Sequence, residues 1–335
     1  MSTSQPLAIE VTDLHRNFGS LKAVDGISFE ISAGTVVGFV GANGAGKTTT
    51  MRILATLDYP TRGVAKIGGI DVVQYPSQVR AKIGWMPDSF GRYPNMTVFE
   101  YLDFFSRALG FRGKDRMARV EDVMDFTDLG PLSARLVNTL SKGMSQRLCL
   151  GRALIHDPEV LILDEPAAGL DPKARVELKH LIRILAEEGK TVLISSHILS
   201  ELSEMCDSLL FINEGRIIHH GSAENLKHND SGTTVIKVET SEDPQKVIEW
   251  LQLSPHAKLL EGLKNGALLE VDSIDTTVIS DLLKRMVQDG LPIVDFHREE
   301  RKLEDAFIDI LGKIESKKSI PAATVPSSPT PVSKS

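Results

Sequence analysis

The chain contains 335 residues, of which 41% are hydrophobic, and its 38 Lys and Arg residues against 45 Asp and Glu residues give a formal net charge of −7. This length and apolar content predict one large domain and a smaller one. The acidic balance opposes a general role in nucleic-acid binding, because such domains carry a basic excess.

The apolar stretches of the sequence are too short to predict a membrane span. The longest, such as 35–40 and 160–163, fall far short of the roughly 20 residues that cross a bilayer. The N-terminal segment lacks a basic region followed by an apolar one, so we expect no secretory signal. The two cysteines, Cys149 and Cys206, have no metal-motif or redox-motif neighbours, and we expect both to be buried in a reducing cytosol.

The first half of the chain predicts strands followed by helices. Residues 9–31 alternate in hydrophobicity, as the strands of an antiparallel sheet do. Residues 35–40 predict a short buried strand that leads into the sequence GANGAGKTT at 41–49, after which a helix is expected. The region 96–155 is predicted to be mostly helical, because apolar residues recur at helical spacing, at Val98, Leu102, Phe105 and Leu109.

The second half returns to strands separated by helices. A strand at 160–163, a helix that ends at Gly189 and a strand at 191–195 follow one another, which predicts a parallel sheet. A strand pair at 208–212 and 216–219 ends this region.

After a polar break at 227–232, the pattern predicts a small α/β accessory domain. Its expected strands lie at 233–239, 267–272 and 293–298, and its expected helices lie at 244–252, 276–289 and 302–312. Residues 313–335 are rich in Pro, Ser and Lys and can bury little apolar surface, so we expect a flexible tail.

The sequence GANGAGKTT has the spacing of a phosphate-binding P-loop. Gly41, Gly44 and Gly46 let the backbone approach phosphate groups, and the helix that starts near Gly46 directs its N-terminal dipole at them. Lys47 supplies a positive charge for the outer phosphates, and Thr48 supplies a hydroxyl for Mg²⁺. The strand before the motif and the helix after it favour this function over a chance glycine-rich turn.

An acidic residue, Asp164, follows the buried strand at 160–163. A carboxylate in this place is costly unless it serves a cation, directly or through water. We therefore predict that Asp164 is a further Mg²⁺ ligand.

Three motifs follow the P-loop in a fixed order: LSKGM at 140–144, VLILDEP at 160–166 and SSH at 195–197. Together with the P-loop they resemble the ATP-binding cassette (ABC) family, and the resemblance covers residues 6–225. It implies an α/β P-loop NTPase cassette at 6–226, with a RecA-like parallel sheet core, an antiparallel β subdomain and a helical subdomain at about 89–157. The accessory domain, at 232–312, and the tail complete the expected fold.

The resemblance also implies that the chain binds ATP with Mg²⁺ and hydrolyses it. Glu165 resembles the family's catalytic glutamate, which polarises or positions the attacking water, and a carboxylate that only caps the strand is the alternative. His197 resembles the switch histidine that contacts the γ-phosphate, and a structural histidine is the alternative. Phe18 occupies the position where the family stacks an aromatic ring on adenine, and a core phenylalanine is the alternative.

Two other motifs imply that the ATPase is paired. Ser141 and Gly143 match the phosphate-facing residues of the family signature LSGGQ, which bind the γ-phosphate held by the other subunit. Ser141 also has the character of a helix N-cap, which is compatible with that role. Lys142 departs from the common form of the signature. Asp171, in AGLDP at 168–172, resembles the key residue of a loop that reaches across the paired subunits, and a simple turn is the alternative.

One position breaks the family pattern. Asp88 stands where the family usually has glutamine; it offers oxygen to Mg²⁺ or water but has no N–H donor, and a simple turn residue is the alternative. The complete set of expected site residues comprises the catalytic residues Glu165 and His197, the ATP-binding residues Phe18, Gly41, Asn43, Gly44, Ala45, Gly46, Lys47, Thr48, Thr49, Ser141, Gly143 and Asp171, and the Mg²⁺ ligands Thr48, Asp164 and Asp88.

Aromatic side chains are concentrated between residues 90 and 105. They are Phe90, Tyr93, Phe99, Tyr101, Phe104 and Phe105. Such enrichment is typical of a docking surface, with core packing as the alternative. In ABC transporters this region receives a cytoplasmic helix of the membrane permease, so the resemblance implies the same partner here.

The resemblance as a whole implies an ATP-hydrolysing subunit that pairs with a second copy or another cassette and powers an integral-membrane permease from the cytoplasmic face of the inner membrane. The segment RKLEDAFIDILG at 301–312 resembles the accessory end of bacterial exporters of drugs, lipids or polysaccharides, so export is expected. The alternatives are a soluble cassette ATPase that remodels a ribosome or a nucleic-acid complex, and a nucleotide-dependent regulatory module. We expect no nucleic-acid partner, and the presence of both Glu165 and His197 argues against a switch that does not hydrolyse ATP.

Overall fold

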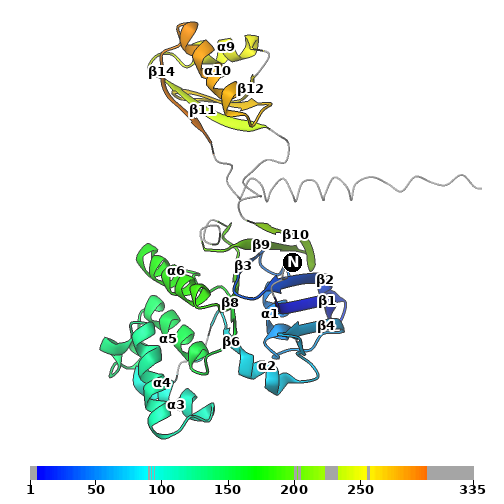
Figure 1. Ribbon diagram of the computed structural model, residues 1–335, viewed down its shortest axis with the longest axis vertical. Helices are drawn as coiled ribbons and strands as arrows, with labels where there is room; N and C mark the ends of the chain where they lie inside the picture. The colour runs from blue at the N-terminus through cyan, green and yellow to red at the C-terminus, as the bar shows by residue number, and fades with distance from the viewer. Residues whose placement is uncertain are drawn as a thin grey trace, which may run out of the picture. The chain divides into compact units, whose positions relative to one another are not determined.

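The computed structural model describes residues 6–89, 91, 93, 95–199, 202, 205–222, 233–254 and 257–299. The chain divides into two compact units, Met1–His228 and Asn229–Ser335 (Figure 1). The expected helix at 302–312, the expected tail at 313–335 and Phe90 lie outside the described residues. Among the described residues, no helix combines the length and the apolar character that a bilayer crossing needs.

The first unit begins with a four-stranded antiparallel sheet in the order β2-β1-β4-β5. Its strands are β1 (Leu7–Phe18), β2 (Leu21–Ser32), β4 (Arg62–Ile67) and β5 (Ile70–Asp71). Strands β1 and β2 alternate between buried and exposed side chains over much of their length, so the antiparallel pair expected at 9–31 is confirmed.

The second sheet of this unit has six strands in the order β10-β9-β3-β8-β7-β6. They are β10 (Arg216–Ser222), β9 (Ser208–Asn213), β3 (Val36–Val40), β8 (Thr191–Ser196), β7 (Val160–Leu163) and β6 (Ile83–Met86). All neighbours pair in parallel except β9 and β10. Every residue of β3, β7 and β8 is buried, which explains their unbroken apolar or small side chains and confirms the expected parallel sheet.

Helices flank the six-stranded sheet. Helix α1 (Lys47–Leu54) lies between this sheet and the antiparallel sheet (Figure 1). The region between β6 and β7 is the expected helical insert, formed by α3 (Val98–Ala108), α4 (Gly113–Phe126) and α5 (Lys142–Leu154) with 3₁₀ turns at Gly130–Leu132 and Val137–Thr139. The remaining helices of this unit with assigned bounds are α2 (Pro76–Lys82) and α6 (Pro172–Glu187).

A hydrophobic core of the first unit lies around α1. It joins residues of the antiparallel sheet to residues of the six-stranded sheet, and Phe29 of β2 packs against Phe39 of β3 with a ring-centroid distance of 6.1 Å. This core fixes the start of α1 against both sheets, and α1 begins with the P-loop lysine, Lys47.

The second unit is a β-α-β-β-α-β fold. Its elements are β11 (Thr234–Thr240), α9 (Gln245–Leu253), β12 (Ala257–Leu263), β13 (Gly266–Val271), α10 (Thr276–Gln288) and β14 (Ile293–Arg298). The strand order is β12-β13-β11-β14 and all pairs are antiparallel, which is the ferredoxin-like arrangement. The α/β accessory fold is confirmed, although strand β12 was not expected from the sequence.

Candidate functional site

The candidate site lies where four parallel strands end. Val40 of β3 pairs with Ser196 of β8, and Met86 of β6 pairs with Leu163 of β7, so the carboxyl ends of these strands are level. Functional groups in open α/β sheets gather at this edge. The P-loop, Asp88, the acidic pair after β7 and His197 after β8 are therefore brought together although they are far apart in the sequence.

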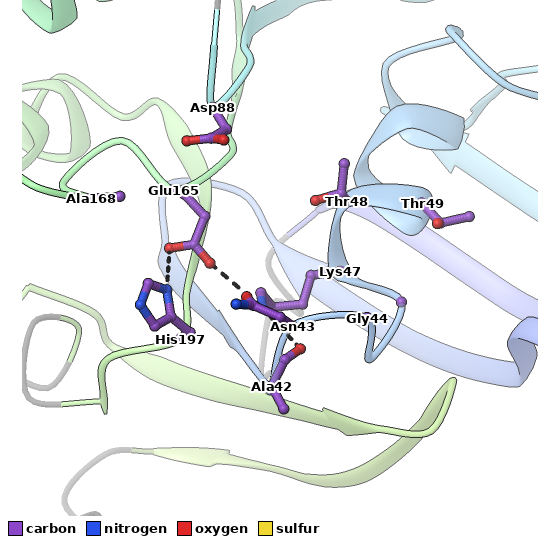
Figure 2. Close-up of a pocket in the computed structure, with 11 residues that line it drawn as sticks. Ala42, Asn43, Gly44, Lys47, Thr48, Thr49, Asp88, Glu165, Ala168 and His197 are labelled. Carbon is purple, nitrogen blue, oxygen red and sulfur yellow. Dashed lines mark hydrogen bonds and ion pairs between the residues drawn. The ribbon is translucent and has the colours of Figure 1, made fainter.

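A cavity of about 380 Å³ opens at this edge (Figure 2). Its volume falls within the range of small-molecule sites, about 300–1,000 Å³. Its lining consists of Ala42, Asn43, Gly44, Gly46, Lys47, Thr48, Thr49, Asp88, Glu165, Ala168 and His197. Gly41, Ala45 and Asp164 lie beside or beneath the lining residues, whereas Phe18, Ser141, Gly143 and Asp171 lie outside the cavity lining.

Gly41 and Gly46 of the P-loop are required by the lack of space around the backbone. A Cβ atom at Gly41 would lie 2.4 Å from the carbonyl oxygen of Ile212, and one at Gly46 would lie 2.5 Å from that of Ala23. Gly46 also has a φ of +111°, which side chains disfavour. Gly46 precedes α1 directly, so the loop delivers the chain to a helix N-terminus whose free N–H groups favour an anion.

Lys47 is a buried cation at the floor of the cavity. Its side chain is 5% exposed, and its ammonium group donates hydrogen bonds to the carbonyl oxygens of Gly41 at 2.6 Å and Ala42 at 3.3 Å. The same ammonium lies 3.5 Å from Oε1 of Glu165 (Figure 2). The charge is therefore held in place by the loop and by the acidic residue, close to where the helix dipole attracts an anion.

Asp164 is a buried carboxylate that accepts a hydrogen bond from strand β8. It is 2% exposed, and its Oδ1 accepts a hydrogen bond of 2.7 Å from the hydroxyl of Ser195. Burial raises the pKa of Asp164, hydrogen bonds from Ser195 and Thr48 oppose this rise, and the charges of Glu165 and Asp88 add to it. A cation beside Asp164 would offset both the burial and the neighbouring negative charges.

Ser195 is a site residue that the sequence analysis did not single out. Its hydroxyl donates to Asp164 and accepts a 2.9 Å hydrogen bond from the backbone N–H of Glu165. One hydroxyl thus orients both acidic residues. The only signal in the sequence is its place two residues before His197, inside the SSH motif.

Glu165 has a strained backbone and two charged or polar neighbours. Its φ of +49° lies in the left-handed region, which is sparsely populated by non-glycine residues and is found at functional sites. Its Oε2 lies 2.9 Å from Nδ1 of His197, while its Oε1 faces Lys47. Figure 2 shows the carboxylate of Glu165 between the two, with Asp88 above it.

The residues expected to bind Mg²⁺ fit an oxygen-coordinating cation. Thr48 and Asp88 line the cavity and Asp164 hydrogen-bonds with Thr48, so a hydroxyl and two carboxylates surround one end of it. Such oxygen ligands suit Mg²⁺, which keeps several waters and takes phosphate oxygens.

The signature region, by which we mean residues 141–143 together with Asp171, lies outside the cavity lining. Ser141 and Asp171 each cap the start of a helix. Ser141 is exposed and its hydroxyl accepts a hydrogen bond of 3.3 Å from the N–H of Met144 at the start of α5. Asp171 is exposed and its Oδ1 accepts one of 2.9 Å from the N–H of Ala174 at the start of α6. The ammonium of Lys142 packs on Gly169, where a Cβ atom would lie only 2.6 Å from it.

Phe18 also lies outside the cavity lining, at the end of β1. Its side chain is 47% exposed, so the alternative of a core phenylalanine is wrong. Both cysteines are buried as expected, and burial raises the pKa of Cys149 to about 11, which leaves a thiol that is inert as a nucleophile.

Comparison with known proteins gives concordant matches. A family model described as "ABC transporter" matches residues 24–168. The chain is 34% identical over 306 residues to the probable multidrug ABC transporter ATP-binding protein YbhF of Escherichia coli; the match covers 91% of this chain and 52% of that protein, so the chain spans about half the length of this relative.

A second relative matches over nearly its whole length. The chain is 37% identical over 305 residues to the Nod factor export ATP-binding protein I of Burkholderia lata, a match that covers 91% of this chain and 97% of that protein. Among solved structures, one described as the structure of an ATP binding subunit of an ABC transporter is similar with a TM-score of 0.60 and 28% identity, covering 66% of this chain and 92% of that one.

Proposed function

Because the chain belongs to the ABC transporter family, we propose that it is the ATP-binding and ATP-hydrolysing subunit of an export-type ABC transporter. The observation that carries this proposal is the convergence of Lys47, Glu165 and His197 on one cavity of about 380 Å³. Each group is held there by named contacts, so the cavity has both a phosphate-binding side and a catalytic side.

The phosphate-binding side is the P-loop. Its backbone N–H groups and the N-terminus of α1 hold the triphosphate, and Lys47 moves from the loop carbonyls and Glu165 to the outer phosphates. Thr48, Asp164 and Asp88 would hold Mg²⁺, which would neutralise charge on the phosphate oxygens. Asn43, Gly44 and Thr49 complete the wall of the cavity.

The catalytic side is formed by Glu165 and His197. Once Lys47 turns to the phosphates, the carboxylate of Glu165 is free to orient a water molecule towards the γ-phosphate. His197, 2.9 Å from Glu165, fixes that carboxylate and lies close enough to the cavity to contact the γ-phosphate itself. Through its two hydrogen bonds, the hydroxyl of Ser195 holds the Asp164 carboxylate and the backbone N–H of Glu165 in place.

We propose that the signature region serves the cavity of a second subunit. Ser141 and Asp171 are exposed and lie outside this chain's own cavity lining, while Gly143 is half-buried beside Ala174. The hydroxyl of Ser141 accepts one hydrogen bond within α5, so its own proton is available to a phosphate oxygen. Two copies facing each other head to tail place such a group over each triphosphate.

A membrane permease is the proposed load. Tyr93 and Phe104 are each 46% exposed, and their ring centroids are 5.9 Å apart. Tyr101, in the same segment, is fully buried. The aromatic segment therefore contributes both to the core and to the surface. The exposed rings of Tyr93 and Phe104 provide an apolar surface on which a helix of the permease can pack. This chain then sits at the cytoplasmic face of the membrane, and the permease selects the cargo.

Export is favoured over the alternative functions by the named relatives. One is a Nod factor export protein and another a probable multidrug transporter protein. The net charge of −7 opposes remodelling of a nucleic-acid complex. The presence of the Glu165–His197 pair opposes a regulatory module that binds nucleotide without hydrolysing it.

The test of this proposal is the Glu165→Gln variant. Loss of the carboxylate should lower steady-state ATP turnover by about 10²–10⁴-fold, the usual contribution of a general base, while ATP binding persists. The matched control is Glu159→Gln, which removes an exposed carboxylate paired with Lys82 and should leave turnover unchanged. Wild-type turnover in the Glu165→Gln variant would contradict the proposed function.

A further inference from the structure

Arg16 and Phe18 form a stacked pair at the end of β1. The two residues are separated by one position, so their side chains project from the same face of the strand. The guanidinium carbon of Arg16 lies 4.3 Å from the centroid of the Phe18 ring, well within the range of a cation–π contact. Because Phe18 is 47% exposed, part of its ring remains open to solvent.

Arg16 is itself held by a two-point ion pair with Asp58. Its Nε donates to Oδ2 of Asp58 at 3.3 Å, and its terminal nitrogen lies 2.8 Å from Oδ1. The side chains are 24% and 16% exposed, so the pair is largely shielded from water. A fork of this kind fixes both the position and the plane of the guanidinium.

The segment that carries Asp58 is fixed to β1 by further hydrogen bonds. The N–H of Thr61 donates to the carbonyl of His15 at 2.7 Å, and the N–H of Asn17 donates to the hydroxyl of Thr61 at 3.0 Å. This segment follows α1, the helix that begins with Lys47. The short segment between α1 and Asp58, together with the Arg16–Asp58 ion pair, thus connects the C-terminal end of α1 to the Phe18 ring.

An exposed ring benefits from such support. Immobilising a free side chain on binding costs conformational entropy, and a ring already held in its bound orientation avoids part of that cost. The residue after Phe18 is Gly19, with a φ of +60°, so the ring stands at a hairpin turn. The guanidinium on one side of the ring provides the support and leaves the remaining ring surface for a stacking partner.

We infer that Arg16 is a positioning residue that orients Phe18 to stack on the adenine base of ATP, and that Asp58 holds Arg16 for this purpose. The inference rests on the proposed ATP-binding function and on the stacking of Phe18 on adenine that the resemblance to the ABC family implies. It gives the Arg16–Asp58 pair a role in nucleotide recognition, whereas a purely structural pair would affect only the stability of the antiparallel sheet.

The experiment compares the affinities of the full-length protein for MgATP and for Mg-tripolyphosphate, which has no base, by calorimetric titration. Arg16→Gln should weaken MgATP binding about threefold to fivefold, as expected for loss of an exposed cation–π contact. Its affinity for tripolyphosphate should not change. Phe18→Ala should weaken MgATP binding by up to about tenfold, and the double variant should bind no more weakly than Phe18→Ala alone.

The matched control is Arg62→Gln, which removes an arginine of the neighbouring strand β4 that pairs with Asp13. It should bind both ligands as the wild type does, and Tm values measured in parallel report any loss of folded protein. The inference is overturned if Arg16→Gln weakens binding of both ligands equally, or if its effect adds to that of Phe18→Ala. Wild-type MgATP affinity in either single variant overturns it as well. A wild-type protein that binds neither ligand would instead contradict the proposed function.

Discussion

The P-loop region and the signature region differ in how completely one chain builds them. In the P-loop region, Lys47 is 5% exposed and Asp164 is 2% exposed, and both are held by hydrogen bonds around a cavity. In the signature region, the side chains of Ser141 and Asp171 are exposed and their hydrogen bonds serve the starts of their own helices.

This difference indicates a division of roles. On the proposed function, the P-loop region supplies the groups that bind the triphosphate, because its cation, hydroxyl and carboxylate already face one cavity. The signature region offers the N-terminus of a helix and lies outside the lining of that cavity. Of these two regions, only the P-loop region should therefore affect MgATP binding, whereas both should affect hydrolysis.

The largest effect is expected at Lys47. On the proposed function, Lys47→Ala should remove two or more charge-assisted hydrogen bonds to phosphate, and at about 1.5–3 kcal/mol each their loss should weaken MgATP binding by about 10²–10⁴-fold. Equilibrium titration checks this. The control is Lys82→Ala, which removes a lysine paired with Glu159 at the surface and should bind normally. Normal binding by Lys47→Ala would remove the basis of the comparison.

A smaller effect, on hydrolysis only, is expected at Ser141. Asp and Asn both cap helices well, so Ser141→Asp and Ser141→Asn should preserve α5, but only the aspartate places a negative charge against phosphate. Like charges in contact cost several kcal/mol. Ser141→Asp should therefore lose at least about tenfold in turnover relative to Ser141→Asn, with unchanged binding of MgATP to the monomer. Equal turnover in the two variants would show that this surface does not face a phosphate.

The smallest effect concerns the stability of the nucleotide-free protein. Burial raises the pKa of Asp164, so its ionised form destabilises the fold at neutral pH, and this cost disappears as the pH falls below the ordinary value of the carboxyl. Asp164→Asn should raise Tm at pH 7, and the difference from wild type should shrink near pH 4. The expected change is small, since about 1 kcal/mol shifts Tm by about 2–4 °C in a domain of 150–250 residues.

A contrasting variant sharpens this measurement. The hydrogen bond from Lys190 lowers the pKa of Asp157, so the charged form of Asp157 stabilises the fold above its ordinary pKa and this contribution is lost as the pH falls. Asp157→Asn should therefore lower Tm at pH 7, opposite to Asp164→Asn. A fall in Tm for both variants would show that burial of the ionised Asp164 carboxylate does not destabilise the fold.

The parts of the fold that the sequence predicted share a strong local signal. Strands β3, β7 and β8 are short and fully buried, so their apolar runs stand out, and Gly41 and Gly46 of the P-loop occupy positions where a Cβ atom would collide with a carbonyl. Strand β12 gave no such signal. It lies at the edge of its sheet and most of its side chains are exposed or half-buried, so its pattern is set by pairing with β13 rather than by burial.

The candidate site likewise combines residues that the sequence predicted with features that it did not. Asp164 was predicted because a carboxylate after a buried strand is costly unless it serves a cation, and Glu165 was predicted from the resemblance to the ABC family. Ser195 was missed, because a serine in a buried strand has no pattern that announces its two hydrogen bonds. The left-handed backbone of Glu165 has no signal in the sequence, and the contact between Lys142 and Gly169 joins residues from two different motifs.

The central claim is that two chains complete each other's sites, and mixing two impaired variants tests it most directly. Lys47→Ala lacks the P-loop cation, and Ser141→Asp places a negative charge against phosphate, so each alone should hydrolyse ATP at least about tenfold more slowly than the wild type. In a mixed dimer, the P-loop of the Ser141→Asp chain meets the intact signature of the Lys47→Ala chain. We predict that the mixture hydrolyses ATP faster than either variant alone. A mixture no more active than its components, together with wild-type specific activity that does not change on dilution, would contradict the account.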